Sequence, residues 1–221
     1  MIEEILPREV VSVESFGDLD EELFPEEEAA IARAVDKRRR EFATVRACAR
    51  HALARLGRPP VPLLPGERGA PRWPHGVVGS MTHCEGYRGA AVAMDDDMLT
   101  VGLDAEPHAP LPDGVLGAVS LDSERRMLAE LAAAAGDVCW DRLLFSAKES
   151  VYKAWYPLVG KMLDFDEAEL DFDPSGAFRA RLLVPGPLVN GAQLTGFHGR
   201  WLVRDGLVMT AIAVAAQASP A

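Results

Sequence analysis

Cysteine is scarce in this chain of 221 residues: Cys48, Cys84 and Cys139 are the only ones, and no two form a CxxC pair. An odd number without close spacing argues against a disulfide framework or a structural zinc site. The acidic first ten residues, MIEEILPREV, show no basic and then apolar leader. We therefore expect a protein of a reducing compartment, the cytoplasm.

Long apolar runs and excess positive charge are missing as well. No apolar stretch approaches the roughly 20 residues of a membrane-spanning helix. The formal net charge is −11, whereas nucleic-acid binding needs clustered lysine and arginine. Neither a P-loop nor a GxGxxG motif is present. We expect neither a membrane nor a nucleic acid as partner, and no Walker-type or Rossmann nucleotide site.

What the chain does contain is enough apolar material, 48% of its residues, for one large domain or two small halves. Its basic residues are unevenly spread, because the segment DKRRREFATVRACAR at 36–50 gathers many of the arginines. A local cationic site in an acidic protein indicates a small anionic ligand rather than a polymer.

The same segment belongs to a predicted helix over residues 25–56. Pro25 suits a first turn, and Gly57 followed by prolines ends the pattern. The apolar positions recur at helical spacing: Ile31, Val35, Phe42, Val45, Ala49, Leu53 and Leu56. Arg38 falls inside this stripe and Arg46 at its border. Either both arginines extend their heads into water, or they form a phosphate site at the edge of the core.

The other helices and strands are predicted from the alternation of apolar residues and from the glycines and prolines that bound each segment. Residues 58–76 are rich in proline and glycine and are expected to be irregular. Strands are predicted at 77–86, 87–94 and 99–106, helices at 121–135 and 140–159, and further strands after residue 168. Helices grouped among antiparallel strands predict an α+β fold.

Two carboxylates follow an apolar run in VGLDAEPH, residues 101–108. Asp104 and Glu106 are two positions apart, so in a strand they share a face and can converge on a hard cation such as Mg²⁺. The alternative is a solvated strand end, because Asp and Glu usually stay exposed.

A second acidic position lies in the predicted helix 140–159. Its apolar face is formed by Leu144, Ala147, Val151, Trp155 and Leu158. Glu149 and Lys153 are four residues apart and adjacent on the helix, which is also the spacing of an ordinary surface ion pair. Alternatively, Glu149 completes a carboxylate trio with Asp104 and Glu106, and Lys153 reaches a phosphate oxygen.

His83 and Cys84 stand where the strand from residue 77 meets a turn. A single histidine is often structural, but beside a phosphate site His83 can donate to an anion. Cys84 lacks any nameable base, and a free cysteine usually packs as a small hydrophobic residue.

Together these motifs resemble the 4′-phosphopantetheinyl transferases. VGLDAEPH and the later KESVYK are similar to the family's paired (V/I)G(I/V)D(I/A)E and (W/F)xxKE(S/A)xxK motifs. GSMTHCEGYRGAAVA resembles the family's strand and turn with histidine, and KRRREFATVRACARHAL its arginine-bearing helix. The likeness runs from about residue 30 to the C-terminus and is strongest to the Sfp/EntD-type branch, especially its actinobacterial members.

This resemblance implies a pseudo-dimer of two similar α+β halves, residues 1–102 and 103–221, with the active site in the cleft between them. It implies transfer of the phosphopantetheine arm of coenzyme A to a serine of an acyl or peptidyl carrier protein, with release of 3′,5′-ADP. The carrier could serve fatty-acid, polyketide or nonribosomal peptide synthesis, including antibiotic or siderophore formation. A monomer is expected.

The resemblance also implies residue roles. Asp104, Glu106 and Glu149 would hold Mg²⁺, for which Mn²⁺ could substitute, and Lys153 would contact the pyrophosphate. The coenzyme A phosphates would be bound by Arg38, Arg46 and His83. A lysine found in some relatives is absent before the histidine strand, and Arg68, or else Arg72, would replace it.

The serine proton needs an acceptor, and Glu149 is our candidate. Glu106 or a metal-bound hydroxide stays open as an alternative. Two other functions use the same residues: a metal-dependent pyrophosphate hydrolase, and a non-catalytic coenzyme A-binding module.

Overall fold

A computed structural model describes residues 1–189 and 191–216. The first part of the chain forms η1 (Ile2–Ile5), β1 (Val11–Ser15), α1 (Pro25–Ala30), α2 (Asp36–Arg55), η2 (Glu67–Gly69), β2 (Val77–Cys84) and β3 (Tyr87–Met94). The second part forms β4 (Met98–Pro107), α3 (Val115–Val119), α4 (Asp122–Ala134), α5 (Trp140–Val159), β5 (Ala168–Asp173), β6 (Ala177–Leu182), β7 (Leu188–Val189), β8 (Ala192–Gln193), β9 (Gly196–Arg204) and β10 (Leu207–Ala215).

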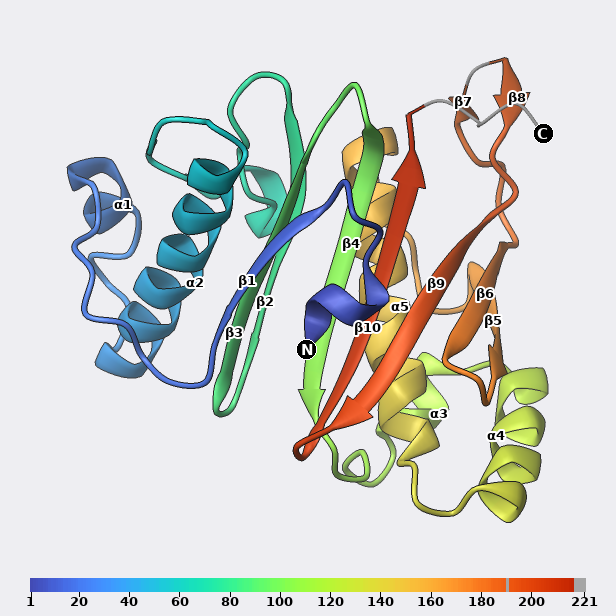
Figure 1. The fold of residues 1–221 in the computed structure, drawn as a ribbon. Helices are drawn as coiled ribbons and strands as arrows, with labels where there is room; N and C mark the ends of the chain where they lie inside the picture. The colour runs from blue at the N-terminus through green and yellow to red at the C-terminus, as the bar shows by residue number, and fades with distance from the viewer. Residues whose placement is uncertain (190, 217–221) are drawn as a thin grey trace.

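The strands form antiparallel sheets, as predicted for an α+β fold. One sheet has the order β1-β3-β2, the larger one the order β4-β10-β9-β6-β5, and β7 pairs with β8. A 20-residue helix packs on each of the two main sheets, α2 against β1 and β3, and α5 against β4 and β10 (Figure 1). The two halves therefore share one plan, a long helix on an antiparallel sheet.

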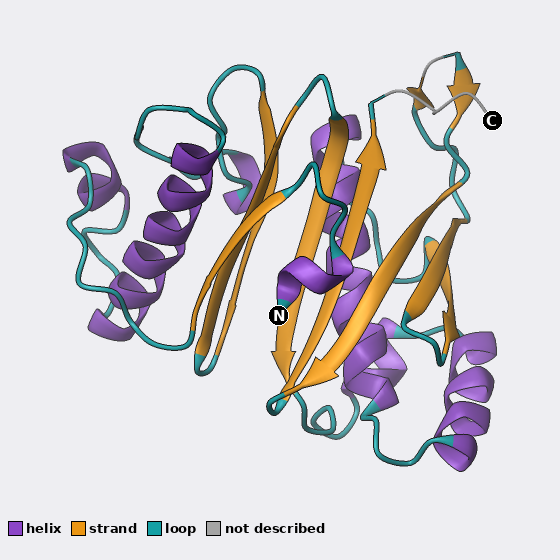
Figure 2. Cartoon of the chain, viewed as in Figure 1, coloured by secondary structure: helices purple, strands orange, loops and turns teal. Residues whose placement is uncertain are grey.

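The predicted single helix over 25–56 is wrong, because the chain turns at residues 31–35 between α1 and α2. In one continuous helix, Glu27 and Arg50 would lie about 34 Å apart along the axis. Here Arg50 Nη1 lies 3.0 Å from Glu27 Oε2, so α1 folds back beside α2 (Figure 2). Ile31 stays buried, while Val35 is 73% exposed at the start of α2.

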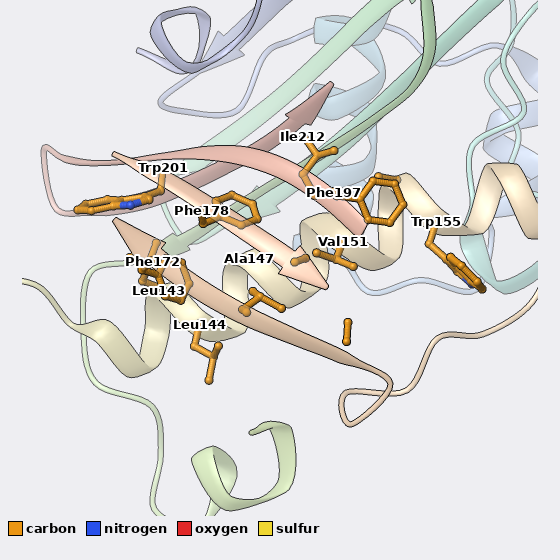
Figure 3. Packing of buried hydrophobic residues seen from close by; sticks show 14 of the residues in the cluster. Leu143, Leu144, Ala147, Val151, Trp155, Phe172, Phe178, Phe197, Trp201 and Ile212 are labelled. Carbon is orange, nitrogen blue, oxygen red and sulfur yellow. The ribbon is translucent and has the colours of Figure 1, made fainter. Parts of the chain in front are cut away.

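The larger core cluster lies between α5 and the five-stranded sheet. The predicted apolar face of α5 is confirmed for Leu144, Ala147, Val151 and Trp155, which belong to one buried cluster with residues of the sheet, while Leu158 is only partly buried against it (Figure 3). Trp140 and Trp201 contact edge to face, with ring centroids 5.4 Å apart.

The predicted boundary at residue 102 falls inside β4. In addition, Ile2 and Ile5 of η1 pack in one cluster with Leu207 and Met209 of β10. The division into 1–102 and 103–221 stays a prediction, and residues 217–221 of its second half lie outside the described residues. No helix in the described ranges has the length and apolar character needed to cross a bilayer.

Candidate active site

A cavity of about 860 Å³ opens between α2 and α5 and is floored by β2. This is within the range of small-molecule sites. The predicted site residues on its wall are Arg38, Arg46, Arg68, His83, Glu149 and Lys153. Asp104 and Glu106 lie beside it, through contacts given below.

The exposure of the two predicted arginines of α2 is the reverse of what the sequence pattern predicts. Arg38 was expected on the core-facing stripe, but its side chain is 50% exposed. Arg46, expected at the border, is only 7% exposed. Within α2 the predicted stripe is confirmed, because Phe42, Val45, Ala49 and Leu53 are buried. Arg38 is exposed because it stands in the first turn of α2, before the buried part of the helix begins at Phe42.

Arg46 is held on several sides. Its Nε donates to the Leu63 carbonyl at 3.0 Å, and its guanidinium stacks 3.2 Å above the centroid of the Phe42 ring. Burial lowers the pKa of Arg46 to about 10, against which the Glu27 charge acts. The group is therefore a fixed cation at neutral pH, facing the cavity.

His83 is the penultimate residue of β2, as the predicted strand and turn require. Its Nε2 lies 2.6 Å from Arg38 Nη1, so in this arrangement it accepts and the ring is neutral. Burial lowers the pKa of His83, and the neighbouring Arg38 charge lowers it further, while Glu41 at 3.6 Å opposes both. Arg38 therefore supplies the positive charge at this edge of the cavity, and the neutral His83 ring accepts a hydrogen bond from its guanidinium.

Both candidate loop arginines, Arg68 and Arg72, line the cavity. Arg68 adopts φ +53°, a left-handed conformation that is uncommon outside glycine. The loop is closed by Gly66 N donating to Ala70 O at 2.7 Å and by Arg72 N donating to Leu64 O at 3.0 Å.

Asp104 is buried where β4 passes beside β2. Its Oδ1 accepts from Lys153 Nζ at 2.7 Å and from Thr82 Oγ1 at 3.2 Å. Its Oδ2 is buried and makes no hydrogen bond with any residue that the structure describes. The surface ion pair between Glu149 and Lys153 is not found among the described residues, because Lys153 pairs with Asp104 instead.

Glu106 has a partner that sequence reasoning missed. Arg142 Nη1 donates to Glu106 Oε2 at 2.9 Å, while its Nε and Nη2 donate to the carbonyls of Ala109 and Pro110. A signal was available: Arg142, Glu149 and Lys153 are seven and then four residues apart, which places them along one side of a helix.

The three acidic residues interact through their charges. Burial raises the pKa of Glu149, and the charges of Asp104 and Glu106 raise it further, while Lys153 opposes them. Burial and then Asp104 likewise raise the pKa of Glu106, against Arg142. Each carboxylate therefore has a repulsion that a cation would relieve.

Within residues 1–189 and 191–216, no three His, Cys, Asp or Glu side chains are gathered closely enough to hold a metal ion. The uncompensated Asp104 Oδ2 and the mutual repulsion of the acids fit a hard cation, whose preferred ligands are carboxylate oxygens. The assignment of Asp104, Glu106 and Glu149 as metal ligands stays a prediction.

Cys84 is not activated as a nucleophile. Burial raises the pKa of its thiol to about 12, with Glu106 and Asp104 acting in the same direction. All three cysteines are free.

Comparison with known families gives two adjacent matches. The 4′-phosphopantetheinyl transferase N-terminal domain matches residues 26–93, and the 4′-phosphopantetheinyl transferase superfamily matches residues 100–206. The first match contains α2, β2 and His83, and the second contains the carboxylates and α5.

Individual relatives agree with the family matches. The chain is 65% identical to the 4′-phosphopantetheinyl transferase Svp of Streptomyces mobaraensis, over 100% of this chain and 92% of the relative. It is 51% identical to Npt of Nocardia iowensis, over 97% and 100%. Similarity to enterobactin synthase component D of Salmonella typhi is lower, 33% over 61% of this chain and 55% of the relative. With this identity extending over whole chains, the protein is an enzyme of the 4′-phosphopantetheinyl transferase superfamily.

Proposed function

We propose that this enzyme transfers the 4′-phosphopantetheine arm of coenzyme A to a serine of an apo carrier protein and releases 3′,5′-ADP. The observation that carries the proposal is a single cavity with guanidinium groups on one wall and a carboxylate and lysine cluster on the other. Coenzyme A has the matching charge pattern, a phosphate at one end of its nucleotide and a pyrophosphate in its middle.

The cationic wall would bind phosphate. Arg38, His83 and Arg46 line it, and Arg68 reaches the cavity from the opposite loop. Guanidinium groups bind phosphate oxygens through short, charge-assisted hydrogen bonds. His83 accepts from Arg38 in this arrangement, so it would have to turn its ring or take up a proton to donate to a phosphate.

The acidic cluster would hold Mg²⁺, or Mn²⁺ in its place, through Asp104, Glu106 and Glu149. Bound there, the ion would neutralise charge on the pyrophosphate. Lys153 lies 2.7 Å from Asp104 and is a quarter exposed, so its flexible ammonium can turn toward the pyrophosphate.

In the transfer, the serine oxygen forms a bond to the β-phosphorus, and the bond from that phosphorus to the bridging oxygen breaks. The electron pair leaves with 3′,5′-ADP, and the hydroxyl proton passes to a base. We assign this base to Glu149, because its raised pKa brings it closer to neutral pH, where a general base is most effective. Glu106 suits the role less well, since Arg142 stabilises its charged form.

The proposed partners are acyl or peptidyl carrier proteins of fatty-acid, polyketide or nonribosomal peptide synthesis. The enzyme is proposed to act as a monomer. A reducing cytoplasm, where free cysteines persist, is the proposed location. Because one relative is named as a component of enterobactin synthase, siderophore synthesis is included among the proposed pathways.

The test is the intact mass of an apo carrier protein after incubation with the enzyme, coenzyme A and Mg²⁺. We expect the gain of one phosphopantetheine, and none when the carrier's serine is replaced by alanine. Rapid release of 3′,5′-ADP without any carrier would instead identify a pyrophosphate hydrolase. Bound coenzyme A with no mass gain on carriers of all three kinds would identify a binding module.

A further inference from the structure

Glu27 is a fully buried carboxylate outside the proposed chemistry. It accepts hydrogen bonds from Phe24 N at 3.0 Å, from Leu63 N at 2.8 Å and from Arg50 Nη1 at 3.0 Å. It therefore ties together the start of α1, the helix α2 and the segment that follows α2. A buried charge is tolerated only when it is paired and hydrogen-bonded in this way.

One of these contacts continues to the cavity. Both backbone polar groups of Leu63 are bound, since its N–H donates to Glu27 and its carbonyl accepts from Arg46 Nε at 3.0 Å. Leu63 is completely buried, so this backbone position has no water to replace either bond. The loop that carries Arg68 and Arg72 into the cavity begins at the next residue, Leu64, whose carbonyl bonds Arg72 N.

We infer that Glu27 is a positioning residue for the phosphate-binding wall: through the backbone of Leu63 it fixes the guanidinium of Arg46. The inference rests on the proposed function, because it requires that Arg46 contact coenzyme A. Glu27 itself touches no substrate, so its effect must pass through Arg46.

The second half of the chain offers a matched control. Glu124 is also almost fully buried, also stands at the third position of its helix, and accepts from Leu121 N, Leu170 N and Lys148 Nζ. It has the same kind of bonds, one to its own helix start, one to a distant backbone N–H and one to a cation of a 20-residue helix. These partners do not connect it to Arg46, so Glu124 reports the effect of losing such a carboxylate elsewhere.

The experiment is a double-mutant cycle with Glu27→Gln, Arg46→Ala and both together, measuring kcat and KM for coenzyme A. Glu27→Gln alone should raise KM by roughly threefold to tenfold and change kcat little. In the Arg46→Ala background the same change should leave KM unaltered. Glu124→Gln should give the same factor with and without Arg46.

Two results would overturn the inference: an equal effect of Glu27→Gln in both backgrounds, or no effect on KM in the parent. If Arg46→Ala itself leaves KM unchanged, the proposed role of Arg46 fails, and the inference fails with it. If the parent enzyme still modifies the carrier protein, the proposed transfer activity stands even when the role of Arg46 fails.

A readout independent of turnover is hydrogen exchange at the Leu63 amide and the Arg46 Nε–H. Both should lose protection in Glu27→Gln and keep it in Glu124→Gln; unchanged protection at Arg46 would contradict the inference. If Glu27→Gln does not fold, Glu27→Asp keeps the charge opposite Arg50 while shortening the reach to Leu63, and the same cycle applies.

Discussion

Asp104 differs from the other two acids in how its oxygens are used. One oxygen is bound by Lys153 and Thr82, and the other is buried without a hydrogen bond to a described residue. Leaving a buried polar atom unpaired is costly, and such atoms often mark where a ligand binds. The side chain is therefore the most sensitive point of the proposed site.

Asp104→Asn tests this point while preserving shape. We expect kcat for carrier modification to fall by about 100-fold or more, because the negative charge toward Lys153 and the proposed cation is lost. Thermal unfolding should show that the fold persists. Turnover close to that of the parent would remove Asp104 from the site.

His83 gives a prediction for stability against pH. Its pKa is lowered in the folded protein by burial and by Arg38 from an ordinary value of 6.5. The unfolded chain therefore binds more protons just below pH 6.5, and the free energy of unfolding decreases as pH falls through this window. In His83→Gln, the part of the decrease in the free energy of unfolding at acid pH that is due to His83 should be absent.

Urea unfolding at several pH values between about 5 and 7.5 measures the effect. His198, an exposed histidine on β9, provides the comparison as His198→Gln. An identical pH slope in the parent and in His83→Gln would contradict the prediction.

At the scale of elements, the spacing of α5 and β4 decides whether Glu149 and Lys153 can reach Asp104. Gly102 on β4 makes this spacing possible: an added Cβ there would lie 2.1 Å from the Ser150 carbonyl and 2.9 Å from Ala154. Only a residue without a side chain lets the helix approach so closely. The hydroxyl of Thr100 binds the Ala154 carbonyl at 2.9 Å on the same contact.

Gly102→Ala should therefore separate α5 from β4. We expect a loss of about 1–3 kcal/mol in the free energy of unfolding, together with lower kcat, because the helix carries the site residues. Chemical denaturation and carrier-modification rates measure the two effects. Gly117→Ala in α3 is the control, since no atom lies within 4 Å of its added Cβ; equal behaviour of the two variants would argue against the close contact.

A second junction of elements explains the residues before His83. Ser80 Oγ accepts from Leu103 N at 3.0 Å, and Thr82 Oγ1 accepts from Ala105 N at 3.1 Å. Hydroxyls of β2 thus satisfy backbone donors of β4, where the two main sheets are not joined by a ladder. The hydrogen bonds of Ser80 and Thr82 therefore hold β2, which carries His83, beside β4, which carries Asp104 and Glu106.

At the scale of the whole molecule, an acidic enzyme must meet a carrier that is itself typically acidic around its serine. The net charge of −11 gives no general attraction to such a partner. We therefore predict that docking depends on local apolar or basic groups near the cavity.

The association rate with a carrier should consequently change by less than about threefold between roughly 0.05 and 0.5 M salt, because screening acts on long-range steering. Stopped-flow measurement over this range tests the prediction. A steep decrease with salt would show that steering by opposite charges dominates.

Local patterns were sufficient for most elements and for the composition of the site. Alternating apolar residues and the positions of glycine and proline predicted β2, β3, β4, α4 and α5, since side-chain period depends on backbone geometry alone. The five-residue helix α3 was not predicted, because it is too short to show a period. The pairing of motifs also indicated the family, which the comparisons confirm. The single helix predicted at 25–56 was wrong because the helical periodicity continues across residues 31–35, where the chain turns and brings Glu27 to Arg50.

Residue types and their spacing were enough to predict which residues form the proposed site and on which side of a strand or helix they lie. Their partners follow from the packing of distant segments: Lys153 binds Asp104 rather than Glu149, Arg142 binds Glu106, and Arg46 rather than Arg38 is buried. The physical reason is that periodicity specifies only the direction in which a side chain points from its own strand or helix. The partner in that direction depends on how distant segments pack, and burial then decides which charges must be paired.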